Sequence, residues 1–242
     1  STPIKSSAAS DVYKRQIKWM VNENSRDYQI EAIVSLGIPL TNIVRKRYKQ
    51  NIKADKVILI ESPSHNNLWS VKESLFFLKK FFKTISYWTN LKNFDGKIYI
   101  DRRDERSDVR KITNESSLVR CANDFGFKQF TFGKYALTEK YKLLQNASLI
   151  IGLYGGGMQL CFISDKLDSC IVLQSPFFYR GFIDYCAHIF KFDVINIMGL
   201  RDEHSKVIST NITDFQNQEF AIYENDFIHS LKIVLDRSTS KE

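Results

Sequence analysis

The sequence predicts an α/β fold in which helices cover both faces of a parallel β-sheet. From residue 97 onward, short apolar runs alternate with amphipathic helical patterns at the spacing typical of β–α–β units. The strand runs are almost continuously apolar, as expected for strands buried on both faces. A chain of 242 residues, 43% of them hydrophobic, is long enough to enclose such a core.

The elements before residue 97 are less regular. A helical pattern at Tyr28–Leu36 ends at Gly37-Ile38-Pro39. The run Val57–Ser62 predicts a buried strand, 63–67 a loop, and Leu68–Lys83 an amphipathic helix with apolar residues three and four apart.

The C-terminal part then alternates strictly between the two kinds of element. We expect strands at Lys97–Ile100, Phe127–Phe132, Ser148–Leu153, Cys170–Ser175 and Phe192–Ile197. We expect helices at Asn114–Asn123, Thr138–Asn146 with Thr138 as N-cap, Gly157–Ser164, Gly181–Phe190 and Asn225–Leu235.

The chain is expected to have two folded parts. Residues 1–16 are small, polar and unpatterned and resemble translated adaptor sequence, so we interpret them as a disordered, non-native leader on an N-terminally truncated fragment. Residues 17–84 would be the remnant of an N-terminal α/β domain with its linking helix. Residues 85–237 would form the C-terminal domain, and 238–242 a tail.

Composition narrows the possible partners. The net charge of +8 predicts affinity for an anion. The four cysteines form no C-x-x-C pair and the histidines show no ligand spacing, so we expect reduced thiols and no metal. The apolar run 147–163 is too short and too rich in glycine to cross a membrane, and the aromatic run 76–82 fits core packing at least as well as a membrane surface.

The most apolar stretch, LIIGLYGGGMQLCFI at 149–163, holds four of the ten glycines of the chain, Gly152 and Gly155 to Gly157. A glycine turn between a buried strand and a helix lets a phosphate or sugar approach the backbone, and the free N–H groups at the helix start favour an anion. The pattern is neither G-x-G-x-x-G nor a P-loop. Close helix–strand packing explains the glycines equally well, and both interpretations stay open.

A second candidate site follows the strand at 97–100. In KIYIDRRDERSDVRKITNE, Arg102 and Arg103 stand at the strand's carboxyl end, the edge where open α/β sheets bind ligands. A guanidinium there can hold a diphosphate with two hydrogen bonds and stabilise it as a leaving group. We expect Arg106 and Arg110 to be solvated loop charges.

Taken in order, KIYIDRRDERSDVRKITNESSL, LIIGLYGGGMQLCFI and CIVLQSPFFYRGFIDYCAHIFKFDVINI resemble glycosyltransferase family 61, over roughly residues 32–199. The resemblance implies an inverting glycosyltransferase of GT-B type, with Rossmann-like domains, no metal requirement, and a nucleotide-sugar donor, first of all a UDP-sugar, held by the C-terminal domain. It also implies a glycan acceptor and a role in the synthesis of capsule or another surface polysaccharide. The location it implies is the cytoplasm, either in solution or at the inner face of the membrane. The residues it assigns to donor binding are Arg102, Arg103, Asn114, Glu115, Tyr154, Gly155, Gly156, Gly157 and Gln174.

Several positions depart from the family pattern. Tyr154 stands in place of the usual His, Asp101 in place of Ser, and Gln174 in place of Glu. These changes motivate the alternative of a catalytically inactive relative that binds a nucleotide sugar or glycan. The candidates for a catalytic base are Asp104, Glu115 and His65, although the base could also belong to a segment upstream of this chain. A nucleic-acid-binding module ranks a distant third, because the basic segment 45–56 has one aromatic residue, Tyr48.

Overall fold

The computed structural model describes residues 17–25, 27–47, 49, 51, 64–65, 69–70, 72–86, 92, 96–102, 111–201 and 218–239. The predicted strand at 57–62 lies outside these residues. The chain divides into two compact units, residues 1–61 and 62–242. The boundary that we predicted at residue 84 stays a prediction.

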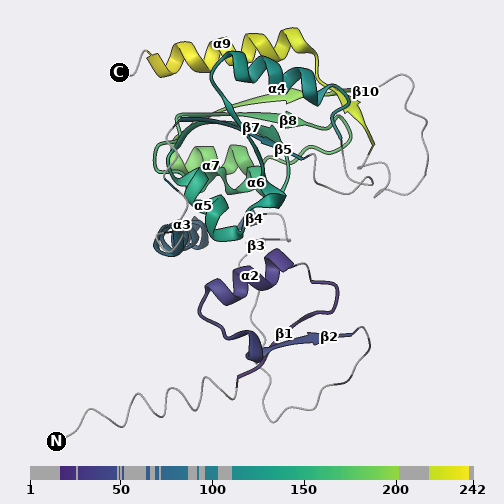
Figure 1. The fold of residues 1–242 in the computed structure, drawn as a ribbon, viewed down its shortest axis with the longest axis vertical. Helices are drawn as coiled ribbons and strands as arrows, with labels where there is room; N and C mark the ends of the chain where they lie inside the picture. Colours follow the sequence, from purple (N-terminus) through teal and green to yellow (C-terminus); the bar gives the residue numbers. More distant parts are fainter. Residues whose placement is uncertain are drawn as a thin grey trace, which may run out of the picture. The chain divides into compact units, whose positions relative to one another are not determined.

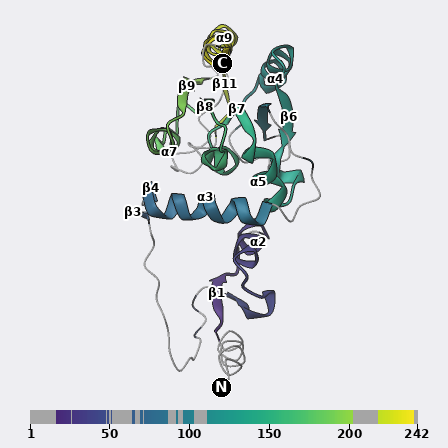
Figure 2. The same ribbon diagram turned by 90° about the vertical axis from the view of Figure 1, so that its left-hand side faces the viewer.

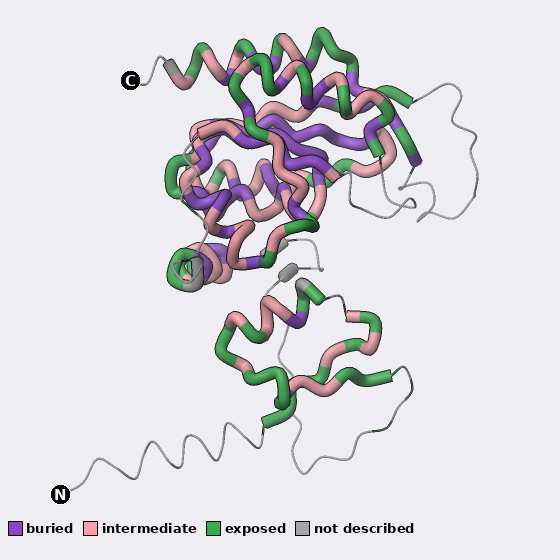
Figure 3. Tube along the Cα trace, viewed as in Figure 1, coloured by how far each residue is buried: buried purple, intermediate pink, exposed green. Residues whose placement is uncertain are grey.

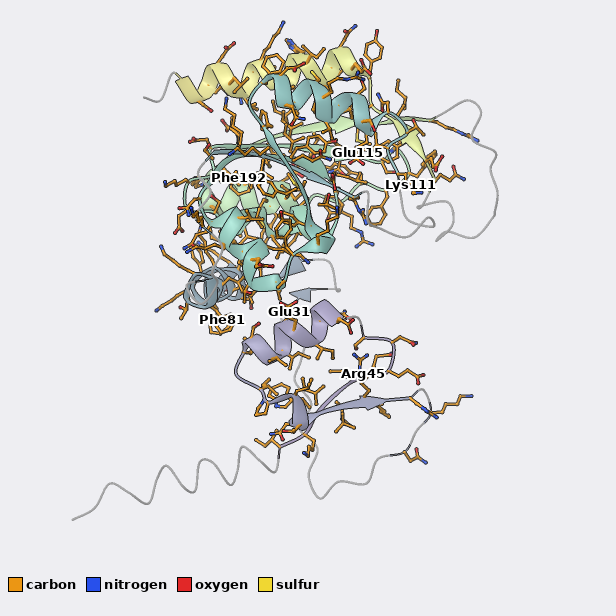
Figure 4. All side chains as sticks on the ribbon, in the orientation of Figure 1. Glu31, Arg45, Phe81, Lys111, Glu115 and Phe192 are labelled. Carbon is orange, nitrogen blue, oxygen red and sulfur yellow. The ribbon has the colours of Figure 1, made fainter. Side chains whose placement is uncertain are left out.

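The first unit is a small β–α–β arrangement. Its elements are β1 (Trp19–Asn22), α2 (Asp27–Ser35), the 3₁₀-helix η1 (Leu40–Asn42) and β2 (Ile43–Lys46). The two strands pair in parallel, from Trp19 opposite Ile43 to Asn22 opposite Lys46. Helix α2 ends where predicted, because Gly37 adopts a φ of +83° that a side chain would disfavour. The arginine of β2, Arg45, lies beside β1's end, where its guanidinium donates to the Glu23 and Ser25 carbonyls (Figure 4).

The second unit is built on a parallel five-stranded sheet with the strand order β6-β5-β7-β8-β9. The strands are β5 (Gly96–Asp101), β6 (Lys128–Thr131), β7 (Ala147–Leu153), β8 (Ser169–Gln174) and β9 (Asp193–Met198). Every neighbouring pair runs parallel. The predicted parallel sheet is confirmed, and all five strands lie within a residue or two of the expected ranges.

Helices cover both faces of this sheet. Figures 1 and 2 both show α4 (Glu115–Asp124) and α9 (Glu224–Thr239) on one face. The opposite face carries α5 (Leu137–Gln145), α6 (Gly156–Gln159), the 3₁₀-helix η3 (Leu160–Ile163) and α7 (Phe182–Phe190). A further 3₁₀-turn, η2 (Phe132–Lys134), follows β6, and the short strands β10 (Leu200–Arg201) and β11 (Phe220–Ala221) pair antiparallel.

The core has two layers separated by the sheet, whose strands are the most continuously buried part of the chain (Figure 3). On the α4/α9 side, one cluster joins odd-numbered strand residues such as Tyr99, Ile151 and Leu173 to Leu118 of α4 and Leu231 of α9. Even-numbered strand residues point the other way, as the two-residue period of a strand requires. Burial of this apolar surface on both faces is what favours the parallel sheet.

Helix α3 (Lys72–Ser86) packs on the α5 side of the sheet. The ring of Phe82 stacks on that of Tyr141 with 3.9 Å between centroids, and Lys83 donates to Asp165 at 2.6 Å. Phe77 is 61% exposed, and its ring stacks on that of Phe81, which Figure 4 labels. The helix begins at Lys72 and not at Leu68, because Trp69–Ser70 forms the short strand β4, paired with β3 (Ser64–His65) in the predicted loop.

Two other predictions about the helices were wrong. The N-cap of α5 is Ala136, whose N–H donates to the Glu139 carboxylate at 2.8 Å, so that the helix begins before Thr138. The helix predicted at 157–164 is one α-turn followed by a tighter 3₁₀-turn. Ser164 ends it by donating its hydroxyl to the Ala147 carbonyl at 2.6 Å.

Candidate functional site

The carboxyl ends of β5 and β7 meet at a topological switch point. The chain leaves β5 for β6 on one side and then crosses to β7 on the other side of β5. The helices that follow these two strands, α4 after β5 and α6 after β7, lie on opposite faces of the sheet. In open α/β sheets, ligands bind in the crevice formed there.

Arg102 and Gly155 come together at this point. Arg102 directly follows β5, and Gly155 lies two residues after β7. A Cβ placed on Gly155 would lie 3.0 Å from Nη1 and 3.5 Å from Cζ of Arg102. The half-buried guanidinium therefore packs over the bare backbone of the glycine turn, and the two sequence blocks singled out above form one site.

The four glycines have different roles. A Cβ on Gly152 would meet the Ile100 carbonyl oxygen at 3.1 Å, and a Cβ on Gly157 would meet the Phe132 ring at 3.2 Å. These two positions need glycine for close packing. Gly156 is exposed and has nothing within 4 Å of its Cβ position, so of the four only Gly156 has no packing reason for glycine, and only Gly155 lies against Arg102.

The helix after the turn is too short to contribute the predicted dipole. Helix α6 has four residues, Gly156–Gln159, before the chain tightens into η3. A macrodipole requires several aligned turns. Among the described residues, the positive charge at this turn thus comes from the Arg102 guanidinium and not from the helix start.

Tyr154, predicted to contact the donor, is buried. Its ring is 2% exposed and lies 6.1 Å from that of Phe178. Its hydroxyl accepts a hydrogen bond from Gln159 Nε2 at 3.0 Å. In this structure the Tyr154 side chain packs against Phe178 and Gln159 at the start of the glycine turn.

Asn114 is held by the backbone of a distant residue. Its Nδ2 donates to the Ile222 carbonyl at 2.8 Å, and its Oδ1 accepts from the Ile222 N–H at 3.1 Å. Both amide groups thus tie the start of α4 to the segment before α9. Glu115 is the first residue of α4 (Figure 4) and is half-buried, with its carboxylate at the favourable end of the helix.

Gln174 ends β8 and heads a chain of hydrogen bonds that sequence reasoning missed. Its Nε2 donates to Asn196 Oδ1 at 3.0 Å, and Asn196 Nδ2 donates to Asp184 Oδ1 at 2.7 Å. The other Asp184 oxygen accepts from the Tyr179 hydroxyl at 3.4 Å. Desolvation first, and the Asp184 charge second, raise the pKa of Tyr179 above its ordinary value. The signal in the sequence was Asn196, a polar residue inside an apolar strand.

The Asp184 carboxylate determines which way each amide in this series of hydrogen bonds is oriented. Because a carboxylate only accepts hydrogen bonds, Asn196 presents Nδ2 to Asp184 and Oδ1 to Gln174. The Gln174 amide then has only one orientation, with Nε2 toward Asn196. At the end of β5, Asp101 is likewise buried and accepts from Gln129 Nε2.

The remaining predicted residues are not placed. Arg103 and Asp104 lie outside the described residues, and His65 lies in β3 with its side chain undescribed. Their roles stay predictions.

The cysteines are free thiols, as predicted. Cys161, Cys170 and Cys186 are buried, and Cys121 is half-buried. A hydrogen bond with Cys170 and then burial raise the pKa of Cys161, and burial raises that of Cys186. Within the described ranges no three His, Cys, Asp or Glu side chains gather as a metal-binding group. No helix in that same part of the chain has both the length and the apolar character needed to span a bilayer.

Comparison with known proteins identifies the family of the chain. The family model for glycosyltransferase 61 matches residues 10–172, about two thirds of the chain. The match includes β5, Arg102, β7 and the glycine turn, and it ends inside β8. The search of curated proteins found no match. The chain therefore belongs to glycosyltransferase family 61, a family of enzymes that transfer sugars.

Proposed function

We propose that this chain carries the donor site of an inverting glycosyltransferase of GT-B type, which moves a sugar from a nucleoside-diphosphate sugar to a glycan acceptor. The observation that supports it is the Arg102 guanidinium over Gly155 at the switch between β5 and β7. This arrangement places a positive charge beside a backbone without side chains, at the edge where α/β sheets bind nucleotides.

The chemistry assigns Arg102 to the leaving group. During transfer, the bond between the anomeric carbon and the diphosphate breaks, and negative charge develops on the phosphate oxygens. A guanidinium already in place stabilises that charge with little reorganisation. The acceptor oxygen attacks from the opposite face of the sugar, which inverts the anomeric centre.

A base must take the proton of the acceptor hydroxyl. Glu115 is the candidate that the structure describes, half-buried at the start of α4; Asp104 and His65 are the others. We expect no metal in this reaction, because the arginines supply the positive charge. Chelation with EDTA should then leave donor binding unchanged.

The nucleotide that we propose is a uridine diphosphate, and the product a cell-surface polysaccharide such as a capsule. Sugar transfer from such donors takes place in the cytoplasm, so we propose that the protein works there or at the inner face of the membrane. Nucleic acid is not a proposed partner.

Calorimetric titration of UDP into the 242-residue chain tests the donor site. Arg102→Ala should weaken binding about 10- to 100-fold, the value of a charge-assisted hydrogen bond. Arg102→Lys should recover only part of it, because an ammonium cannot form the two parallel hydrogen bonds. Arg120→Ala, an exposed arginine in the middle of α4, is the matched control for net charge. Equal affinities for Arg102→Ala and Arg120→Ala would reject the site.

Two features favour a second candidate function, a catalytically inactive donor-binding relative. Tyr154 is buried and its hydroxyl is engaged by Gln159, and Gln174 has a neutral amide where the family resemblance leads us to expect a carboxylate. A protein that binds UDP-sugars at the Arg102 site but consumes none in the presence of any acceptor would support this candidate. Release of UDP upon addition of an acceptor would exclude it.

A further inference from the structure

The connection between β8 and α7 is a fixed corner beside the glycine turn. The Phe178 N–H donates to the Ser175 carbonyl at 3.1 Å, and the Phe177 N–H donates to the Ser175 hydroxyl oxygen at 3.2 Å. Pro176 stands at the second position of this turn, where its fixed φ is favourable. The path of residues 175–178 is therefore set before any ligand binds.

Two side-chain contacts place the next residues. The Phe178 ring lies 6.1 Å from that of Tyr154, the residue that directly precedes Gly155. The Tyr179 hydroxyl donates to Asp184, whose other oxygen is held by Asn196. The corner is thus tied to the glycine turn on one side and to α7 and β9 on the other.

Arg180 follows these anchors and stacks on the same ring. Its Cζ lies 5.0 Å from the centroid of Phe178, a cation–π distance. A continuous line of contacts therefore runs from Arg102 across Gly155 and Tyr154 to Phe178 and Arg180.

The charge of Arg180 is available. The side chain is exposed, and among the described residues no carboxylate lies within ion-pair distance of its guanidinium. Asp184, the acidic residue in the first turn of the helix that follows, has both oxygens occupied by neutral donors. An arginine held by an aromatic ring, with no anionic partner among the described residues and linked through Phe178 and Tyr154 to the turn against which Arg102 packs, is arranged to receive an anion.

We propose that Arg180 is a second diphosphate-binding residue, which acts with Arg102 from the opposite side of the glycine turn. The two guanidiniums then bind the same diphosphate from two different strand ends, β5 and β8. This inference rests on the proposed function for the identity of the ligand, but Arg180 itself lies beyond the segment matched by the family model.

The experiment compares pyrophosphate, UDP and uridine as calorimetric probes at 150 mM salt, with Arg180→Ala, Arg102→Ala and Arg120→Ala as variants. Arg180→Ala should weaken pyrophosphate and UDP by about tenfold or more, as loss of a charge-assisted contact does. It should leave any uridine binding and the melting temperature unchanged. Arg120→Ala removes the same charge from α4 and should bind like the wild type.

The outcomes separate this inference from the proposed function. Pyrophosphate and UDP affinities of Arg180→Ala within twofold of the wild type, with Arg102→Ala impaired, would overturn the role of Arg180 and leave the donor site standing. Pyrophosphate binding that depends on both arginines, without any UDP binding, would support Arg180 and reject the uridine nucleotide. A folded wild-type protein that binds neither probe would overturn both.

Discussion

The glycine cluster allows one prediction with an internal control, because neighbouring glycines differ in what surrounds them. Gly152 is paired directly with Ile100 of β5. A methyl group on Gly152 would lie 3.1 Å from the Ile100 carbonyl oxygen, 3.3 Å from Ile100 Cβ and 3.3 Å from Met158 Sδ. Two of these three atoms belong to a paired strand that cannot move without breaking sheet hydrogen bonds.

Gly152→Ala should therefore destabilise the chain by about 1–3 kcal/mol, the usual cost of overpacking. At about 2–4 °C per kcal/mol for a domain of this size, the melting temperature should fall by about 2–12 °C. Thermal unfolding followed by circular dichroism measures it, and urea unfolding checks the free energy.

Gly156→Ala and Gly155→Ala are the matched controls. Gly156→Ala adds a methyl group where no atom lies within 4 Å, so its melting temperature should equal that of the wild type. The second meets the flexible end of Arg102, which can move away, so the melting temperature should hold while UDP binding weakens. A Gly152→Ala protein as stable as the wild type, or a Gly156→Ala protein as damaged as Gly152→Ala, would refute the reasoning.

Three further predictions concern other residues. Asn114→Ala should lower the free energy of unfolding, measured with urea, by about 1–3 kcal/mol for each Ile222 backbone group that it leaves without a partner. The folded variant should keep its UDP affinity, and a lost affinity would show that Asn114 contacts the donor. Glu139→Ala removes the acceptor of the Ala136 N–H and should lower the free energy of unfolding by about 0.5–1.5 kcal/mol in the same assay. Glu139→Gln keeps an acceptor and is the control; equal losses in both variants would contradict this. Burial raises the pKa of Cys186, so the folded state retains a proton that the unfolded thiol releases, and stability should fall as pH rises above about 8.5. Cys186→Ala should make the fall in unfolding free energy between pH 8 and 10 shallower, and an unchanged slope would contradict the assignment.

The sequence predicted the alternating elements well because burial dictates them locally. All six residues of β8 are buried, and such a run has few alternatives to a central parallel strand. The strand order could not be predicted in the same way, because the alternation of strands and helices does not show on which side of β5 the strand β7 lies. That order creates the switch point, so the site could be proposed from strand ends but located only in three dimensions.

The individual roles of site residues depended on contacts between distant segments. Asn114 binds Ile222, 108 residues away, and nothing near Asn114 indicates this partner. Tyr154 reads as a polar residue in a turn, yet its ring is buried against Phe178 from another loop. Gly152 and Gly157 look like members of one ligand-binding cluster, and only the positions of Ile100 and Phe132 show that they serve packing.

The place of β7 in the sheet has a consequence for local unfolding. This strand pairs with β5 on one side and β8 on the other, and all but one of its seven residues are buried, whereas β6 and β9 are the edges. Amide protons of β7 can exchange with solvent only when the whole sheet opens, while edge strands and helix ends open by smaller fluctuations. The turn at Tyr154 and Gly155 is therefore attached to the segment of the unit that we expect to exchange most slowly, and this attachment holds the backbone against which the Arg102 guanidinium packs.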